Sequence, residues 1–411
     1  MMIPVMIQAL GKNPFRPGVG TKPLYLAGRD QPIRRFRSVI RAAPEQPANM
    51  RLTGLRGVGK TVLLGEFQSA AQQLEWATAF LELQPGHNTD DAVSETLGAA
   101  IKTAREEVSR VERLKSTMGS ATRKAGTLGI GWGEFQMTYQ PGAAPQREDL
   151  ARALFEAVES VVKHGKEGLM LLVDEAQVIR DETRPTGQHP LSLVVASVAS
   201  LQKAELPIGM VLCGLPTLTG NLLRARSYSE RMFRGEEIGS LGPEDAMDAL
   251  VRPLATTPLE VHRGLAERIV DEVEGYPYFL QLWGAELWDA ADVVGVRTFS
   301  AQLLDETRPE IFRRLDLDFY DPRVSTLTPA AQDVLLASAD CPYPPLVVAD
   351  LNDAISKTPG NVNVLLGRLV ESGVLYRIRK GQYEYTAPKF RDYLVRRTDR
   401  GKQARLFGAA S

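Results

Sequence analysis

Several features are scarce in this sequence of 411 residues, and each scarcity argues against a class of protein. The two cysteines, Cys213 and Cys341, are too few for the disulfide framework of a small secreted domain. The four histidines are scattered, and no Cys or His stands at metal-ligand spacing, which argues against a dedicated zinc site. The longest uninterrupted apolar run is Leu169–Val173, whereas a membrane-spanning helix needs about 20 residues. We therefore expect no membrane span and a cytoplasmic location.

An excess of charge of either sign is also missing. The sequence has 49 Lys and Arg against 50 Asp and Glu, for a formal net charge of -1. This balance argues against a protein dedicated to coating DNA or an anionic membrane. Basic side chains nevertheless gather locally, along residues 99–124 and around residues 377–402.

Hydrophobic periodicity predicts an α/β fold in the first 240 residues. Residues 1–23 are rich in Pro, Gly and basic side chains and predict an extended arm. Beyond them, helices and apolar strands alternate, which is typical of a mostly parallel sheet covered on both faces. We expect helices at 31–41, 61–75, 90–124, 147–164 and 191–204, and strands at 49–53, 76–83, 168–173, 208–213 and 237–241.

The second half of the sequence has a different pattern. Residues 241–320 contain no clear strand and predict a helical subdomain. Residues 321–400 predict helices at 328–338, 345–356 and 360–372, then an alternating stretch at 374–388 and a last helix from Lys389. Three helices followed by a hairpin form a winged helix, a helix-turn-helix variant. Residues 401–411 are expected to be a flexible tail.

The strongest chemical signal lies at residues 54–61, Gly-Leu-Arg-Gly-Val-Gly-Lys-Thr, which match the phosphate-binding pattern G-x-x-x-x-G-K-[ST]. Glycines let backbone N–H groups turn toward phosphate oxygens, and the following helix adds the positive end of its dipole. Lys60 is expected to reach the β- and γ-phosphates of ATP, and the Thr61 hydroxyl to bind Mg²⁺. We assign nucleotide binding to Gly54, Gly57, Val58, Gly59, Lys60, Thr61 and Val62.

A second signal is the buried strand that ends in Asp174-Glu175. Ligands of open α/β sheets bind beyond the carboxyl ends of the strands. We expect Asp174 to hold the Mg²⁺ and Glu175 to polarise the attacking water as general base.

Together these motifs resemble those of the AAA+ ATPases, with similarity to the replication-initiator and signal-transduction members over residues 24–400. The resemblance implies a P-loop core at 24–240 with an insertion at 90–139, a helical lid at 241–320 and a winged helix at 321–400. Leu26-Ala-Gly28-Arg29-Asp30 resembles the family's N-terminal box, whose apolar neighbours line the adenine pocket. Gly275-Tyr-Pro277 resembles the Gly-x-Pro element of the signal-transduction lid. The resemblance thus adds Leu26, Gly28, Arg29 and Pro277 to the nucleotide site.

The resemblance also implies an arginine finger, which stabilises the phosphoryl group of a neighbouring subunit. Arg231 is the first candidate and Arg234 the second; a surface salt bridge is the alternative for both. The sequence departs from the family at two places. The strand at 208–213 lacks the usual polar residue at its tip, where Thr217 could substitute, and the lid lacks the second-sensor arginine.

Two basic regions are candidate contacts for a partner. The insertion at 90–139 carries a charged helix and a predicted hairpin at 127–139 with Trp132, Phe135 and Tyr139, which could stack on nucleic acid or merely pack on the core. The wing and tail supply Arg377, Arg379, Lys380, Arg396, Arg397, Arg400 and Lys402 for phosphates, beside Asn361, Asn363 and Arg368 on the recognition helix. Winged helices also serve as protein contacts.

Three functions remain open at this point. The first is an ATP- and Mg²⁺-dependent ATPase that acts as a switch or assembly factor on double-stranded DNA, with ATP or ADP controlling a homo-oligomer. The second is a signal-transduction ATPase whose partner is a protein. The third is a helicase, suggested only by the Asp-Glu-Ala-Gln string at 174–177.

Overall fold

The computed structural model describes residues 10–18, 20–117, 145–184, 186–226, 228–355 and 359–408. These residues divide into two compact units. Unit 1 takes the described parts of Met1–Gly28, Leu55–Gly59 and Gly239–Ser411, and unit 2 takes those of Arg29–Gly54 and Lys60–Ile238.

Unit 2 is built on a parallel five-stranded sheet. Its strands are β1 (Ala48–Gly54), β2 (Trp76–Glu82), β3 (Gly168–Asp174), β4 (Ile208–Gly214) and β5 (Arg234–Ile238). Their order is β2-β3-β4-β1-β5, and every neighbouring pair is parallel. β3 and β4 are buried along their whole length, as strands covered on both faces must be. The predicted α/β fold is confirmed.

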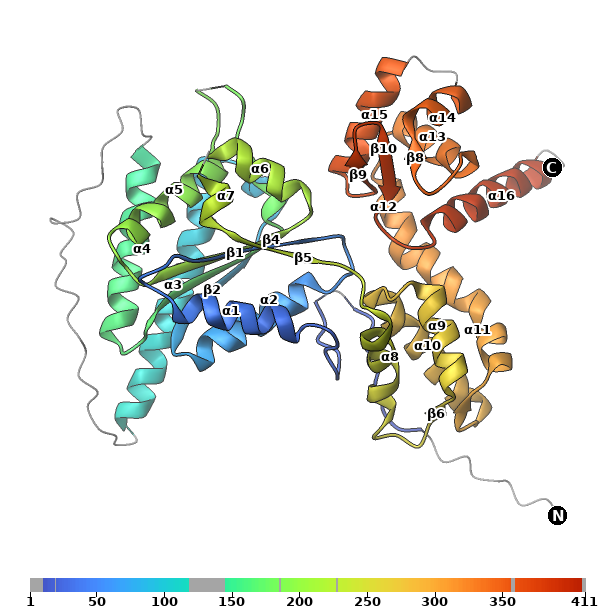
Figure 1. Cartoon of the computed structure of the whole chain (residues 1–411), viewed down its shortest axis with the longest axis horizontal. Helices are drawn as coiled ribbons and strands as arrows, with labels where there is room; N and C mark the ends of the chain where they lie inside the picture. The colour runs from blue at the N-terminus through green and yellow to red at the C-terminus, as the bar shows by residue number, and fades with distance from the viewer. Residues whose placement is uncertain are drawn as a thin grey trace. The chain divides into compact units, whose positions relative to one another are not determined.

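Helices cover both faces of this sheet (Figure 1). On one face lie α1 (Asp30–Arg41) and α2 (Lys60–Gln73). On the other, α3 (Asp90–Thr117), α4 (Pro145–Lys163) and α5 (Pro190–Lys203) form one hydrophobic core with the sheet. Two shorter helices, α6 (Thr217–Ala225) and α7 (Ser229–Met232), lead from β4 into β5.

One expectation for this unit changes, and two others are described only in part or not at all. The strand expected at 237–241 lies three residues earlier: β5 pairs Arg234–Ile238 with Met50–Gly54, and its buried residues are Glu236 and Ile238. The helix expected at 90–124 corresponds to α3 over Asp90–Thr117, and residues 118–124 lie outside the described residues. The apolar stripe of α3 from Leu97 to Val108 packs in the core. The predicted hairpin at 127–139, with Trp132, Phe135 and Tyr139, lies outside the described residues.

Unit 1 begins with a helical part. Its helices are α8 (Pro243–Val251), α9 (Arg263–Val273), α10 (Pro277–Val294) and α11 (Ala301–Arg314). Contrary to the expectation of no strand, β6 (Glu260–Val261) pairs in parallel with β7 (Thr298–Phe299). Two residues per strand are too few to give a period in the sequence.

The helical run does not stop at residue 320, where the sequence suggested a boundary. α11 continues through a π-helix, η4 (Leu315–Tyr320), directly into α12 (Asp321–Ser325). Beyond it come α13 (Pro329–Ala337), β8 (Leu346–Val347), α14 (Val348–Ala354) and α15 (Pro359–Glu371). β9 (Leu375–Arg379) and β10 (Gln382–Tyr385) form an antiparallel hairpin, and the three strands have the order β8-β10-β9. α16 (Phe390–Gly408) ends the described chain, so residues 401–408 are helical rather than an unstructured tail.

The described part of the N-terminal arm packs against α10. Asn13 donates to the Ala285 carbonyl at 3.1 Å and to the Asp289 carboxylate at 2.9 Å. Phe15, which is 3% exposed, lies over Gly284 of α10. A β-carbon on Gly284 would come within 2.4 Å of that ring, so the glycine makes room for the arm.

Candidate functional site

The predicted phosphate-binding loop connects β1 to α2. Gly57 and Gly59 have φ angles of +82° and +88°, a region that side chains with a β-carbon rarely adopt. The sequence Gly-Val-Gly therefore makes the turn possible, and α2 begins at Lys60. Val58 and Lys60 are buried, and Val62 is half-buried in the first turn of α2.

The two predicted metal ligands meet within unit 2. Thr61 Oγ1 donates to Asp174 Oδ2 at 2.6 Å, although 113 residues separate them in the chain. Asp174 is 2% exposed at the end of β3, and its other oxygen, Oδ1, accepts from the backbone N–H of Glu175 at 2.8 Å. Thr61 and Asp174 lie close together because parallel strands bring their carboxyl ends, and the loops that follow, to one edge of the sheet.

This donor set fits magnesium. Mg²⁺ prefers hard oxygen ligands and is held by one or two protein groups together with substrate phosphates. Thr61 and Asp174 supply two such oxygens side by side. Within the described ranges, no group of three or more His, Cys, Asp or Glu could hold a metal ion.

Glu175 follows in a strained conformation. Its φ of 52° and ψ of 32° place it in the left-handed region, where a residue with a β-carbon is uncommon. Gln177 Nε2 donates to Glu175 Oε2 at 2.5 Å. The Asp174-Glu175 motif does not predict this contact. Gln177 is the last residue of the Asp-Glu-Ala-Gln string at 174–177, which suggested a helicase.

The tip of β4 contributes an apolar environment. Cys213 is fully buried, and burial raises the pKa of its thiol well above the usual value, with a further rise from the Asp174 charge and an opposing effect from Lys60. The thiol therefore stays protonated beside Asp174. Thr217, which the sequence suggested as a substitute polar residue, lies at the start of α6.

Within unit 1, the phosphate-binding loop contacts the residues of the Gly-x-Pro element. The Tyr276 hydroxyl donates to the Arg56 carbonyl, and the Tyr278 backbone N–H donates to the Gly57 carbonyl at 3.3 Å. Tyr276 is 2% exposed, and burial raises the pKa of its hydroxyl. Gly275 has a φ of +64°, and a β-carbon there would come within 2.3 Å of the Leu241 carbonyl. Pro277 begins α10, where a missing N–H costs nothing.

The N-terminal box is split between the units. In unit 1, Gly28 has a φ of +64°, and a β-carbon would meet the Asp245 carboxylate of α8 at 2.6 Å. Leu26 is half-buried in the same segment. In unit 2, Arg29 is 8% exposed at the N-cap of α1.

Both finger candidates are exposed. Arg231 lies in the short helix α7, and Arg234 is the first residue of β5 rather than part of the loop before it. Exposure is what a residue acting on a neighbouring subunit requires, and it equally suits a solvated arginine.

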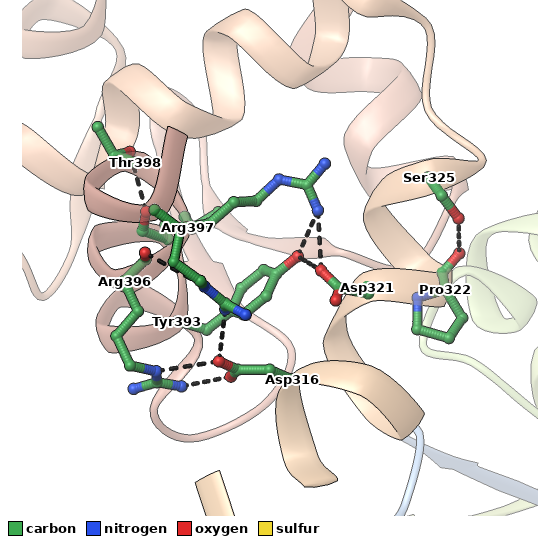
Figure 2. A network of polar contacts seen from close by, with 10 residues as sticks. Asp316, Asp321, Pro322, Ser325, Tyr393, Arg396, Arg397 and Thr398 are labelled. Atoms are coloured by element: carbon green, nitrogen blue, oxygen red, sulfur yellow. Dashed lines mark hydrogen bonds and ion pairs between the residues drawn. The ribbon is translucent and has the colours of Figure 1, made fainter. Parts of the chain in front are cut away.

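The C-terminal basic residues fall into two groups that differ in their surroundings. Arg377, Arg379 and Lys380 lie exposed on β9 and its turn. Three arginines of α16 instead pair with acids, as Figure 2 shows for two of them: Arg396 binds Asp316 at 2.5 Å and Arg397 binds Asp321 at 2.9 Å, while Arg400 binds Asp316 at 2.6 Å. Asp316 is 3% exposed. The tail arginines predicted for phosphates are thus occupied by carboxylates. The Lys402 side chain lies outside the described residues.

Comparisons with known proteins identify the larger framework. Residues 25–199 match the model of the AAA ATPase domain. This part of the chain is therefore similar to an AAA ATPase domain. Residues 317–394 match a domain of unknown function, DUF8462. A search of the curated proteins gives no match.

Solved structures share the AAA+ fold at low identity. The Walker-type ATPase PABY2304 of Pyrococcus abyssi is 17% identical, with a TM-score of 0.56 over 90% of this chain and 96% of that one. The ORC2 protein of Aeropyrum pernix in ADPNP-ADP complexes is 12% identical, with a TM-score of 0.54 over 95% and 99%. Its ADP form has a TM-score of 0.51 over 94% and 96%, also at 12% identity. These similarities concern the fold alone.

Among the described residues, no helix is both long and apolar enough to cross a membrane.

Proposed function

We propose that this chain is an ATP-hydrolysing switch whose nucleotide state controls its engagement of duplex DNA. The observation that carries the ATPase part is the 2.6 Å contact between Thr61 and Asp174. It brings the phosphate-binding loop and the acidic strand end together as the chemistry of nucleotide hydrolysis requires.

Each residue has a defined role in this proposal. The loop from Gly54 to Gly59 offers backbone N–H groups to phosphate oxygens, and Lys60 adds a positive charge at the β- and γ-phosphates. Magnesium, when bound, neutralises charge on the phosphates. Thr61 and Asp174 would hold it, and Glu175 accepts a proton from the attacking water. The other residues to which we assign nucleotide binding are Leu26, Gly28, Arg29, Val62 and Pro277.

Two substitutions test the ATPase. Lys60→Ala should abolish binding of a fluorescent ATP analogue, because it removes the charge that faces the phosphates. Glu175→Gln should bind ATP normally and lower kcat by about 100-fold or more, as expected when a general base is lost. Arg152→Ala is a matched control, since Arg152 is an exposed cation on α4 that pairs with Asp149. Tight ATP binding by Lys60→Ala would rule out this site.

Engagement of DNA is supported by the exposed wing. Three helices followed by a hairpin have the element order of a winged helix, and Arg377, Arg379 and Lys380 extend from its hairpin into solvent. α15 presents Asn361, Asn363 and Arg368 on an exposed face. Amide and guanidinium groups read base edges, and basic groups bind phosphates.

A protein partner is the second candidate, and a specific observation favours it. Val364 is 57% exposed on α15 and Ile378 is 46% exposed on β9, among the residues assigned to DNA. Exposed apolar side chains suit a protein interface better than a phosphate backbone.

Sedimentation with a slowly hydrolysed ATP analogue, with and without duplex DNA, separates the two candidates. Assembly that needs both nucleotide and duplex supports the DNA switch and a nucleotide-dependent homo-oligomer in which Arg231 reaches the neighbouring site. Assembly with nucleotide alone, and no DNA binding at low salt, supports the protein partner.

A further inference from the structure

A glutamine that the ATPase motifs do not include bridges two strand ends in unit 2. Gln177 lies in the short helix η2 (Ala176–Val178), two residues after Glu175. Its side-chain Nε2 donates to Glu175 Oε2 at 2.5 Å, and its Oε1 accepts from the Leu215 backbone N–H, beyond β4, at 2.9 Å. The backbone carbonyl of Gln177 accepts from Asn221 of α6 at 3.3 Å.

The chemistry of these partners fixes the orientation of the amide. A backbone N–H can only donate, so the atom facing Leu215 must be the amide oxygen. The NH₂ group then has to face Glu175, whose ionised carboxylate can only accept. The choice between amide oxygen and nitrogen, which is often ambiguous, is settled here by the two partners.

The tip of β4 is shaped to admit this amide. A β-carbon on Gly214 would lie 2.4 Å from Gln177 Oε1, so any other residue there would displace the amide. The sequence lacks a polar side chain at this tip, and Gln177 supplies the polar group from the neighbouring strand end.

On the basis of the proposed ATPase function, we infer that Gln177 is a positioning residue that holds the Glu175 carboxylate in place for catalysis. One carboxylate oxygen is fixed by the amide, which leaves the other for water. Glu175 stands on a strained backbone at half-exposure, so its side chain needs an outside contact to keep one orientation.

Two substitutions at Gln177 separate its contacts. Gln177→Glu keeps an acceptor for the Leu215 N–H and removes the donor to Glu175, whereas Gln177→Met removes both and keeps the length of the side chain. Gln73→Glu is the control, because it makes the same change of amide to carboxylate at an exposed site on α2.

We expect Gln177→Glu and Gln177→Met to lower kcat for ATP by about tenfold or more, with the Kd for ADP within about twofold of wild type. Thermal unfolding should change little. In the Glu175→Gln background, Gln177→Met should leave the residual single-turnover rate unchanged, because the group on which it acts is already gone.

Other outcomes overturn the inference. An unchanged kcat would show that Glu175 does not need the amide. A fall in kcat matched by an equal loss of ADP affinity or of thermal stability would show a structural role. If the wild-type protein neither binds nor hydrolyses ATP, the proposed ATPase function is wrong. If the wild-type protein hydrolyses ATP and the Gln177 variants do so at the same rate, only the proposed role of Gln177 is wrong.

Discussion

The hydroxyl of Tyr276 donates a hydrogen bond to the backbone carbonyl of Arg56, in the middle of the phosphate-binding loop. The two residues are 220 positions apart in the sequence. The tyrosine ring also packs against the Phe279 ring, with the ring centroids 4.8 Å apart. The conformation of the loop is therefore tied to a rigid, buried side chain of unit 1.

Tyr276→Phe should loosen the loop and keep the ring packing. A buried hydrogen bond contributes about 1 kcal/mol, so amide hydrogens of the loop should exchange about fivefold faster. Hydrogen exchange read by mass spectrometry on peptides that span residues 52–62 measures this. Tyr278→Phe is the control, because Tyr278 reaches the loop through its backbone N–H. Equal exchange in both variants would contradict the role of the hydroxyl.

Thr61→Ala should weaken nucleotide binding only when magnesium is present. The change removes a predicted ligand, so affinity for ATP with Mg²⁺ should fall by about tenfold, while affinity in EDTA should change by less than about twofold. Titration calorimetry under both conditions measures the difference. Thr61→Ser keeps the hydroxyl and should behave like wild type. A loss of equal size in EDTA would show that Thr61 supports the fold of the loop rather than the metal.

The wing should determine the salt dependence of DNA binding. Each phosphate contact contributes about 0.9 to the slope of log K against log salt, so alanine at Arg377, Arg379 and Lys380 should reduce that slope by about 2.7. Fluorescence anisotropy of a labelled duplex at several salt concentrations measures it. Alanine at Lys102, Arg105 and Arg110, exposed on α3, tests the rival surface. If this second variant alone flattens the slope, the wing is not the DNA contact.

Asp316→Asn should destabilise unit 1. The buried carboxylate binds Arg396 and Arg400, and its loss leaves two guanidinium groups without their acid. Both arginines are partly exposed, which moderates the cost to about 2 kcal/mol. Asp318→Asn is the matched control, since Asp318 is largely exposed and lies 3.8 Å from Arg314. Chemical denaturation should show a loss for Asp316→Asn alone; equal curves would mean that the pairs contribute nothing.

Local patterns in the sequence were enough to predict the sheet and the edge of it on which the candidate site lies. The Gly-rich turn depends on adjacent residues, and a buried strand ending in Asp174 can place its carboxylate only at the carboxyl edge of a parallel sheet. Both features are local in the chain, and the structure confirms that Thr61 and Asp174 meet.

Contacts between distant segments could not be predicted in the same way. The pairing of Asp316 with Arg396 joins residues 80 positions apart, and nothing in the sequence separates these arginines from those of the wing. The sequence marks Gln177 only as the last residue of the Asp-Glu-Ala-Gln string and does not predict its contact with Glu175. Its partner beyond β4 is defined by the sheet order, which periodicity does not give.

The docked arm has a consequence for how the chain folds as it is made. The partners of Asn13 on α10 lie 272 and 276 residues further along the chain. At about 5–20 residues per second, a ribosome needs about 14–56 s to synthesise that interval. During this time Phe15 has no helix to cover it. Unit 1 can therefore complete its core only late in synthesis, after the sheet of unit 2 has emerged, and its assembly depends on contacts of long sequence separation, which form slowly.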